Sequence, residues 1–368
     1  MQKNKIIFIK KFFFSLVVLL FSLFFWHTLK NVFLYEYITK VEMIVYFIYL
    51  IILLFGFYGI YDEFIKVKKN IINISKVDFL RNAQLLLHSI YDPSRIAGND
   101  VLRSRHVREL VQEAVPIENS SSRTNIPKVI VQFWHDLNEI PDDVQECLDS
   151  WEPLKKQGFK RILFDDAGAR RFISKQLGDT YVSAFDLCHH PAMRCDYFRL
   201  CYIVTYGGFY IDADEIYQGT ECNHFFRDGR LKVQPLCYDT ATGTMIKPDV
   251  FIRKRGWSPN WIFYVNNNPL IAPSNHPIIR LALDRATHIL LSYSEKRLEI
   301  QSSTGPGNLT ASLVRHSISS KLTGRNRDFL ILPNWEATSI SPWPLSYRYD
   351  ERNWRLWDPI GSMGGRFK

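Results

Sequence analysis

The sequence predicts an α/β domain that follows an N-terminal pair of transmembrane helices. Two long apolar runs occupy much of the first sixty residues. From about residue 125, short β-branched runs alternate with helical patterns, which favours a parallel sheet with a ligand site at the carboxyl ends of its strands. The stretch "GGFYIDADEIY" (207–217) ends an apolar run with closely spaced carboxylates, and it is the natural place to look for that site.

The apolar runs at 12–29 and 43–61 are each close to the roughly 20 residues that a helix needs to cross a bilayer. Both are apolar on all sides, which is typical of a membrane span. A secretory signal peptide is the alternative for the first run, but no small-residue cleavage site follows it. A buried core helix is the alternative for either run. We expect residues 1–62 to form two transmembrane helices.

Charges beside these runs predict their orientation. Lysines precede the first run and follow the second, whereas the loop between them carries Lys30 and Lys40 against Glu36 and Glu42. The positive-inside rule then puts both ends of the hairpin, and the domain that follows it, in the cytoplasm. If only the second run spans the membrane, the domain instead faces the periplasm or a lumen such as that of the Golgi.

Charge and cysteine content exclude some classes of protein. The net charge is +9, but residues 1–82 hold eleven Lys/Arg against five Asp/Glu, so most of the excess lies beside the apolar runs. No nucleic-acid-binding motif accompanies it, and a nucleic-acid partner is not expected. The six cysteines have neither zinc-site nor disulfide-scaffold spacing, which predicts free and mostly buried thiols.

Residues 63–124 are charged and helix-prone, and we interpret them as a helical stalk and linker before a domain at 125–368. The domain begins with "IPKVIVQFWH", a strand pattern that puts Trp134 at the strand end, where a ligand is expected. Next, "FKRILFDDAGARRFISKQLG" predicts a strand and then a helix capped by Asp165 or Asp166.

The segment before the carboxylates predicts a helix that starts near Pro191 and runs to Tyr206, with two glycines ending it. The strand then emerges as "FYIDADE", so that Asp212 and Asp214 share one of its faces while Ile211 and Ala213 pack on the other. Two like charges beside an apolar run need a compensating cation. Mg²⁺ or Mn²⁺, held by these carboxylates and by substrate phosphate, is the simplest candidate, and a solvated strand end is the alternative.

Asp196 and Arg199 lie three residues apart on this helix, in an otherwise apolar segment. They therefore share a helical face, and as a surface pair they would contribute only a few tenths of a kcal/mol, on the order of other such pairs. In a site, a forked donor and an acceptor are what is needed to hold sugar hydroxyls in a fixed pose.

These motifs together resemble the sugar-binding, DXD-containing glycosyltransferases of family 32, which include initiating mannosyltransferases and capsular polysaccharide enzymes. The resemblance rests on "IPKVIVQFWH", "RILFDD", "RCDYFRLCYIVTYGGFYIDADE" and the downstream "STGPGNLTASL" (303–313). It implies a GT-A fold, a nucleoside diphosphate sugar donor, a glycan or lipid-linked acceptor, a divalent metal and retention of anomeric configuration. Surface polysaccharide synthesis at a membrane is the expected setting.

The resemblance also implies roles for individual residues. Asp212 and Asp214 become ligands of the metal and the diphosphate, Asp196 and Arg199 hold the donor sugar, and Trp134 lies against the base. Near the C-terminus, "DERNWRLWDP" (350–359) keeps tryptophans with a compatible spacing, but Asn353 stands where many relatives have a histidine. The resemblance therefore leaves three candidates for a third metal ligand, and it implies that the tryptophans lie at the donor site. The ligand candidates are Asn353, Glu351 and Asp350, and the tryptophans are Trp354 and Trp357.

The same residues allow two other functions. "FYIDADEI" also resembles the nucleophile strand of haloacid-dehalogenase-like phosphatases, in which the first Asp attacks phosphorus. That family requires a Thr or Val where this chain has Ile216, and a later acidic cluster that this sequence does not provide in the expected place. A membrane scaffold that binds a sugar nucleotide without turnover is the non-catalytic alternative.

Overall fold

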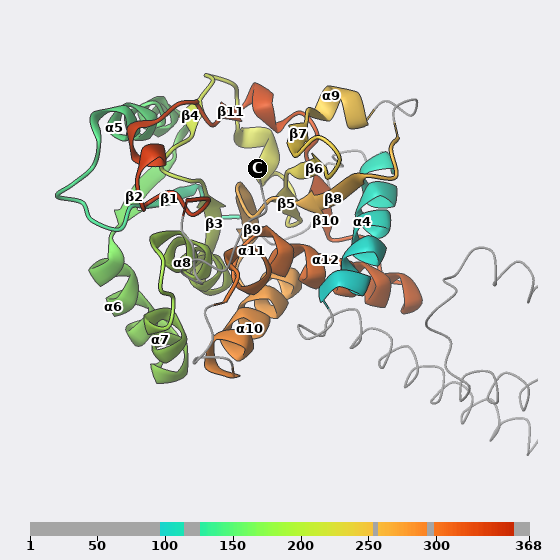
Figure 1. Ribbon diagram of the computed structural model, residues 1–368. Helices are drawn as coiled ribbons and strands as arrows, with labels where there is room; N and C mark the ends of the chain where they lie inside the picture. Colours follow the sequence, from blue (N-terminus) through green and yellow to red (C-terminus); the bar gives the residue numbers. More distant parts are fainter. Residues whose placement is uncertain (1–95, 114–125, 253–256, 293–297, 357–368) are drawn as a thin grey trace, which may run out of the picture. The chain divides into compact units, whose positions relative to one another are not determined.

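The computed structural model describes residues 96–113, 126–252, 257–292 and 298–356 (Figure 1). The predicted membrane spans at 12–29 and 43–61, and also Trp357, lie outside these residues. Within the described ranges, no helix is both long enough and apolar enough to cross a bilayer.

A six-stranded mixed sheet, in the order β10-β5-β9-β3-β1-β2, forms the centre of the domain. Strands β2, β1 and β3 are parallel, as the alternating pattern predicts, and β10 is parallel to β5. Strand β9 is antiparallel to both β3 and β5, so the expectation of an all-parallel sheet is wrong. The chain enters β9 from a second sheet, and an antiparallel pair needs no helical crossover. The strands are β1 (Val129–Phe133), β2 (Lys160–Phe164), β3 (Gly207–Tyr210), β5 (Leu231–Val233), β9 (Leu270–Pro273) and β10 (Phe329–Ile331).

Helix boundaries in the first half follow local sequence signals. Asp165 caps α6, accepting a 2.6 Å hydrogen bond from the Gly168 amide, so of the two predicted caps Asp165 is the one used. Helix α8 begins at Pro191 and ends at Tyr206, as predicted, with His190 as its N-cap. The helices are α5 (Asp142–Asp149), α6 (Asp166–Gln176), α7 (Asp179–Asp186), α8 (Pro191–Tyr206), α10 (Pro277–Ser292), α11 (Ile300–Ser303) and α12 (Pro306–Leu322), with the 3₁₀ turn η1 (Glu152–Gln157).

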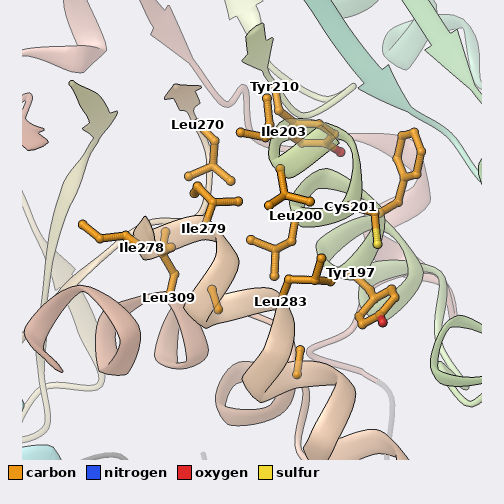
Figure 2. Close-up of a cluster of buried hydrophobic side chains, with 14 of the residues drawn as sticks. Tyr197, Leu200, Cys201, Ile203, Tyr210, Leu270, Ile278, Ile279, Leu283 and Leu309 are labelled. Atoms are coloured by element: carbon orange, nitrogen blue, oxygen red, sulfur yellow. The ribbon is translucent and has the colours of Figure 1, made fainter. Parts of the chain in front are cut away.

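Helix α8 lies in the middle of the largest apolar cluster. Figure 2 shows its Leu200 and Ile203 among side chains from β3, β9, α10 and α12. Tyr197 is fully buried there, and its hydroxyl lies 2.6 Å from Thr287 Oγ1 on α10. Because core packing holds both faces of α8, polar side chains on this helix have fixed positions relative to the sheet.

Two smaller sheets lie beside the central one. The first has the order β7-β6-β8. The second pairs β4 with β11, and so joins the residues just after Asp214 to the C-terminal part of the domain. The remaining elements are β4 (Ile216–Tyr217), β6 (Pro235–Asp239), β7 (Thr244–Ile246), β8 (Trp261–Val265), β11 (Ser339–Ile340), α9 (Pro248–Phe251), η2 (Asn223–Phe226), η3 (Trp335–Ala337) and η4 (Ser346–Tyr349).

Helix α4 (Ile96–Gln112) falls within the segment interpreted as a stalk, and it packs on the domain. The Ser104 hydroxyl accepts a 2.9 Å hydrogen bond from the Phe263 amide of β8, and His106 Nε2 lies 3.1 Å from Ser317 Oγ of α12. The rest of the predicted stalk and linker, 63–95 and 114–124, lies outside the described residues.

All six cysteines are free, and all are buried except Cys195, which is partly exposed. The expectation of free and mostly buried thiols is therefore confirmed.

Candidate functional site

The carboxylates of "DADE" do not lie on a strand. Strand β3 ends at Tyr210, Asp212 has no regular secondary structure, and Ala213 and Asp214 form a turn before β4 begins at Ile216; we call residues 212–214 the DXD turn. The predicted shared strand face is thus wrong, because the β pairing stops one residue short of the motif. Ile211 and Ala213 are buried, as the alternation predicts, but they belong to different apolar clusters.

Gly207 makes the tight path from α8 into β3 possible. Its φ is 70°, in the left-handed region that glycine favours. A Cβ at this position would lie 2.5 Å from the backbone nitrogen of Ser274, which is closer than real Cβ atoms come. The predicted glycine helix stop is confirmed, and it fixes where the DXD turn emerges from the sheet.

Arg199 joins helix α8 to the DXD turn. Its Nη2 lies 2.9 Å from Oδ1 of Asp196 and 2.9 Å from Oδ1 of Asp212. Only 4% of the Arg199 side chain is exposed, and its guanidinium also stacks on Tyr210. The predicted Asp196–Arg199 pair therefore exists, but it is a buried bridge to the DXD turn rather than a local surface pair.

A run of asparagines before Pro269 supports the same carboxylates from the other side. Asn267 Nδ2 donates to Asp196 at 2.8 Å, and its carbonyl accepts from Arg199 Nη1 at 2.9 Å. Asn268 Oδ1 accepts from the Asp212 amide, and its Nδ2 donates to Glu215. Sequence reasoning missed these residues. Three consecutive asparagines before a proline indicate a turn, but nothing local indicates what the turn contacts.

Asp214 faces a different part of the chain, the segment after β11. Its Oδ2 accepts from the Tyr347 hydroxyl at 2.6 Å and from Arg348 Nη2 at 2.6 Å. These donors are more than 130 residues away in sequence, and sequence reasoning missed both. The Ser346 amide and hydroxyl bind Asp143 of α5, so this segment, red in Figure 1, runs beside α5.

Burial and like charge together perturb the acids of the turn. Burial raises the pKa of Asp212 to about 6, with Arg199 opposing the shift and Asp214 adding to it. Burial also raises the pKa of Glu215 to about 8, with Asp214 adding to that shift. Carboxylates that are this reluctant to ionise together form a favourable place for a cation.

The donor set can be tested against a divalent metal. Asp212 and Asp214 offer hard oxygen ligands, which suit Mg²⁺ or Mn²⁺. In the described part of the chain, no group of three or more His, Cys, Asp or Glu side chains is arranged to hold a metal ion. The residues therefore fit a metal that is held by one or two carboxylates together with the phosphate oxygens of a substrate, and they do not fit an all-protein cage.

The downstream Gly-Pro segment contacts Asp196. Gly305 precedes α12, and a Cβ placed on it would lie 3.2 Å from Asp196 Oδ2. Burial raises the pKa of Asp196, while Arg199 and the hydrogen bond from Asn267 oppose the shift. The motif that contains Asp196 and the motif that contains Gly305 are about a hundred residues apart in sequence, and they are neighbours at the Asp196 carboxylate.

Trp134 lies directly after β1, at the strand end where the pattern places it. Its ring meets Tyr347 edge-on with centroids 5.4 Å apart, and it packs in a cluster that includes Ala213 of the DXD turn. Its Nε1 donates to the Glu139 carbonyl at 3.2 Å. Trp134 is therefore beside the turn, and its ring is held by the Tyr347 contact and by the hydrogen bond to the Glu139 carbonyl.

Two of the three candidate third ligands, Asn353 and Asp350, have side chains that bond to other protein groups. Asn353 is buried. Its side-chain Nδ2 donates to the backbone carbonyl of Arg348, and its Oδ1 accepts from the backbone amide of Arg355. Asp350 pairs with Arg352 at 2.6 Å, and Glu351 offers its backbone carbonyl to His190. Their assignment as metal ligands stays a prediction. Trp354 packs against the main apolar cluster, and Trp357 lies outside the described residues.

Comparison with known proteins matches part of this chain to a glycosyltransferase region. Residues 141–224 match the family described as "Glycosyltransferase sugar-binding region containing DXD motif". A solved structure titled "PaToxG Glycosyltransferase" is 14% identical and has a TM-score of 0.36; the match covers 69% of this chain and 92% of that one. No curated protein matches the sequence.

The matched segment runs from α5 to η2 and contains Asp196, Arg199, Asp212 and Asp214. The chain therefore contains a glycosyltransferase sugar-binding region with a DXD motif, which supports its being a glycosyltransferase. Such an enzyme takes its sugar from a nucleotide-sugar donor and passes it to an acceptor.

Proposed function

We propose that this chain is a membrane-anchored, metal-dependent, retaining glycosyltransferase of GT-A fold, similar to family 32. It would transfer a sugar from a nucleoside diphosphate sugar to a glycan or lipid-linked acceptor in surface polysaccharide synthesis. The observation that carries this proposal is the Arg199 bridge, which holds Asp196 and the first acid of the DXD turn on one guanidinium.

Asp196 and Arg199 have different tasks in this proposal. The guanidinium of Arg199 donates to Asp212, to the Asn267 carbonyl and to Cys195, so its donors are used to orient protein groups. Asp196 has its Oδ1 bound by Arg199 and Asn267, and it serves as the acceptor for a sugar hydroxyl. Arg199 is then a positioning residue, and Asp196 is the residue that contacts the donor sugar.

The DXD turn serves the diphosphate. Asp212 and Asp214 would hold Mn²⁺ or Mg²⁺, which when bound stabilises the negative charge that grows on the departing diphosphate. The protein orients Asp212 through Arg199 and Asp214 through Tyr347. Trp134, beside the turn, would provide an apolar face for the base, and Trp354 and Trp357 keep the donor-binding role that the resemblance implies.

Anchoring is proposed from the sequence. The apolar runs at 12–29 and 43–61 would form a hairpin whose lysine-rich flanks keep the catalytic domain on the cytoplasmic side. A single span with a lumenal domain, as in a Golgi enzyme, is the alternative.

Donor hydrolysis tests the proposal. Purified protein is incubated with UDP- and GDP-sugars and Mn²⁺, and release of the nucleoside diphosphate is measured. Turnover of a subset of donors that stops with EDTA supports it. Tight nucleotide binding with no turnover of any donor, with or without candidate acceptors, would favour the scaffold alternative. Release of inorganic phosphate from simple phosphate esters would favour the phosphatase.

A further inference from the structure

Arg348 lies where a metal ion bound to Asp214 would have to compete with it. It belongs to η4, and 10% of its side chain is exposed. Its Nη2 contacts Asp214 Oδ2 at 2.6 Å and Ser341 Oγ at 2.7 Å, and its guanidinium stacks over the Trp343 ring at 4.5 Å. The same carboxylate oxygen also accepts from Tyr347, so both donors of this segment converge on one atom of the DXD turn.

The bonding of Arg348 is incomplete. Its Nε is buried, and the described residues offer this atom no hydrogen-bond partner. A buried donor left without a partner costs about 1–3 kcal/mol, so a ligand that accepts from it binds favourably. Arginine presents its donors as a planar fork that matches the oxygens of a phosphate group.

A second cation lies close to Arg348. Arg355 stacks on Trp354 at 4.6 Å, and none of the ion pairs formed by the described residues includes it. Burial lowers the pKa of Arg355, and the neighbouring charge of Arg348 lowers it further, whereas Asp214 acts in the opposite direction. Arg348 pairs with Asp214, and the charge of Arg355 acts on both groups, so two cations are available on this side of the DXD turn.

We infer that Arg348 exchanges Asp214 for the diphosphate of the donor when metal and donor bind. This inference rests on the proposed function. The exchange moves the guanidinium from Asp214 Oδ2 to a phosphate oxygen and leaves the carboxylate to the metal. Arg355 adds positive charge on the same side of the turn.

The exchange predicts effects of opposite sign for the metal and the nucleotide. Without nucleotide, Arg348 competes with the metal for Asp214, so removing its charge strengthens metal binding. With nucleotide, Arg348 supplies charge-assisted hydrogen bonds to phosphate, so removing it weakens nucleotide binding. A residue that only supports the local fold would weaken both.

Calorimetric titrations of Arg348→Gln separate these possibilities. Mn²⁺ is titrated alone, and UDP and GDP are then titrated at saturating Mn²⁺. We expect Mn²⁺ alone to bind about 2- to 5-fold more tightly, because a partly exposed competing ion pair is lost. We expect the nucleoside diphosphate to bind about 10- to 100-fold more weakly. Arg170→Gln is the control: Arg170 also pairs with an aspartate, Asp186, at 2.8 Å, but neither residue belongs to the proposed site, and both affinities should stay at the wild-type values.

The outcomes are distinguishable. Unchanged nucleotide affinity in Arg348→Gln, or Mn²⁺ binding weakened together with it, overturns the exchange while leaving the proposed function in place. Failure of the wild-type protein to bind either nucleotide overturns the proposed function and this inference with it. If Arg348→Gln does not fold, Arg348→Lys keeps the charge but not the fork, and a nucleotide affinity equal to that of the wild type in this variant also overturns the exchange.

Discussion

The Nη2 atom of Arg199 lies 2.9 Å from Asp196 Oδ1 and 2.9 Å from Asp212 Oδ1, so one guanidinium holds an acid of helix α8 and the first acid of the DXD turn. The Arg199 side chain is 4% exposed and that of Asp196 is 9% exposed. This relationship makes the spacing between the proposed sugar contact and the proposed metal ligand a property of the folded core.

Arg199→Ala is expected to destabilise the domain by about 3–5 kcal/mol, because it leaves buried carboxylates without their cation. Urea unfolding measures the loss. Arg170→Ala is the matched control: Arg170 also pairs with an aspartate at 2.8 Å, Asp186, but that pair is exposed and its removal should matter far less. Equal destabilisation by the two substitutions would contradict the buried-bridge description.

Gly207→Ala should destabilise the fold more than a left-handed glycine alone requires. Gly207 has φ 70° and ψ −170°, a region essentially restricted to glycine that costs another residue about 1–3 kcal/mol, and its added Cβ would also meet the backbone of Ser274. Gly158 is in the ordinary αL conformation, with φ 85° and ψ 15°, and a Cβ added there would meet nothing within 4 Å, so Gly158→Ala reports the cost of a left-handed glycine without a close approach. Thermal unfolding of both variants gives the comparison, and similar midpoints would show that the close approach is unimportant.

Sequence reasoning succeeded where the signal was local. The Asp165 cap, the boundaries of α8 and the Asp196–Arg199 pair each depend on residues within one helix or its ends. The DXD turn was wrongly predicted as part of a strand, because alternation of apolar and polar residues does not show where the neighbouring strands of the sheet end. Asn268 contacts Asp212 across 56 residues, and such a contact has no local pattern.

The same limit applies to the C-terminal segment. Tyr347 and Arg348 reach Asp214 across more than 130 residues, and no pattern near them in the sequence indicates that contact. The pairing of β4 with β11 brings this segment to the turn. Only the tertiary fold determines that an arginine, rather than a histidine or an asparagine side chain, faces the second acid of the motif.

His190 should make stability depend on pH. Its Nδ1 accepts from the Ala192 amide and caps α8, and its Nε2 contacts the Glu351 carbonyl. Burial lowers the pKa of His190 from 6.5, so as the pH falls the unfolded chain takes up this proton before the folded one does. The free energy of unfolding should therefore decrease as the pH falls below about 6.5.

His190→Asn tests this dependence, because asparagine can cap the helix but does not titrate. The slope of unfolding free energy between about pH 6.5 and pH 5 should become shallower than in the wild type. The same substitution at exposed His288 should leave the slope unchanged. An unaltered slope in His190→Asn would mean that other groups cause the acid sensitivity.

Reporter fusions test the proposed topology. Alkaline phosphatase fused after residue 40 should be active and a fluorescent protein fused after residue 80 should fluoresce, because an even number of spans returns the chain to the cytoplasm. Phosphatase activity from a fusion after residue 80 would contradict both the hairpin and the cytoplasmic assignment.

The central claim is that the DXD turn is the metal and donor site of a glycosyltransferase. The most direct test measures the Mn²⁺-dependent release of nucleoside diphosphate from a nucleotide-sugar donor. The assay compares the wild type with Asp214→Asn and Asp249→Asn. Asp249 is an exposed aspartate at the start of α9 and serves as the control. We predict that the wild type and Asp249→Asn turn over at the same rate, that EDTA stops both, and that Asp214→Asn is inactive while it remains folded. Full turnover by Asp214→Asn, or by EDTA-treated wild type, would contradict the claim.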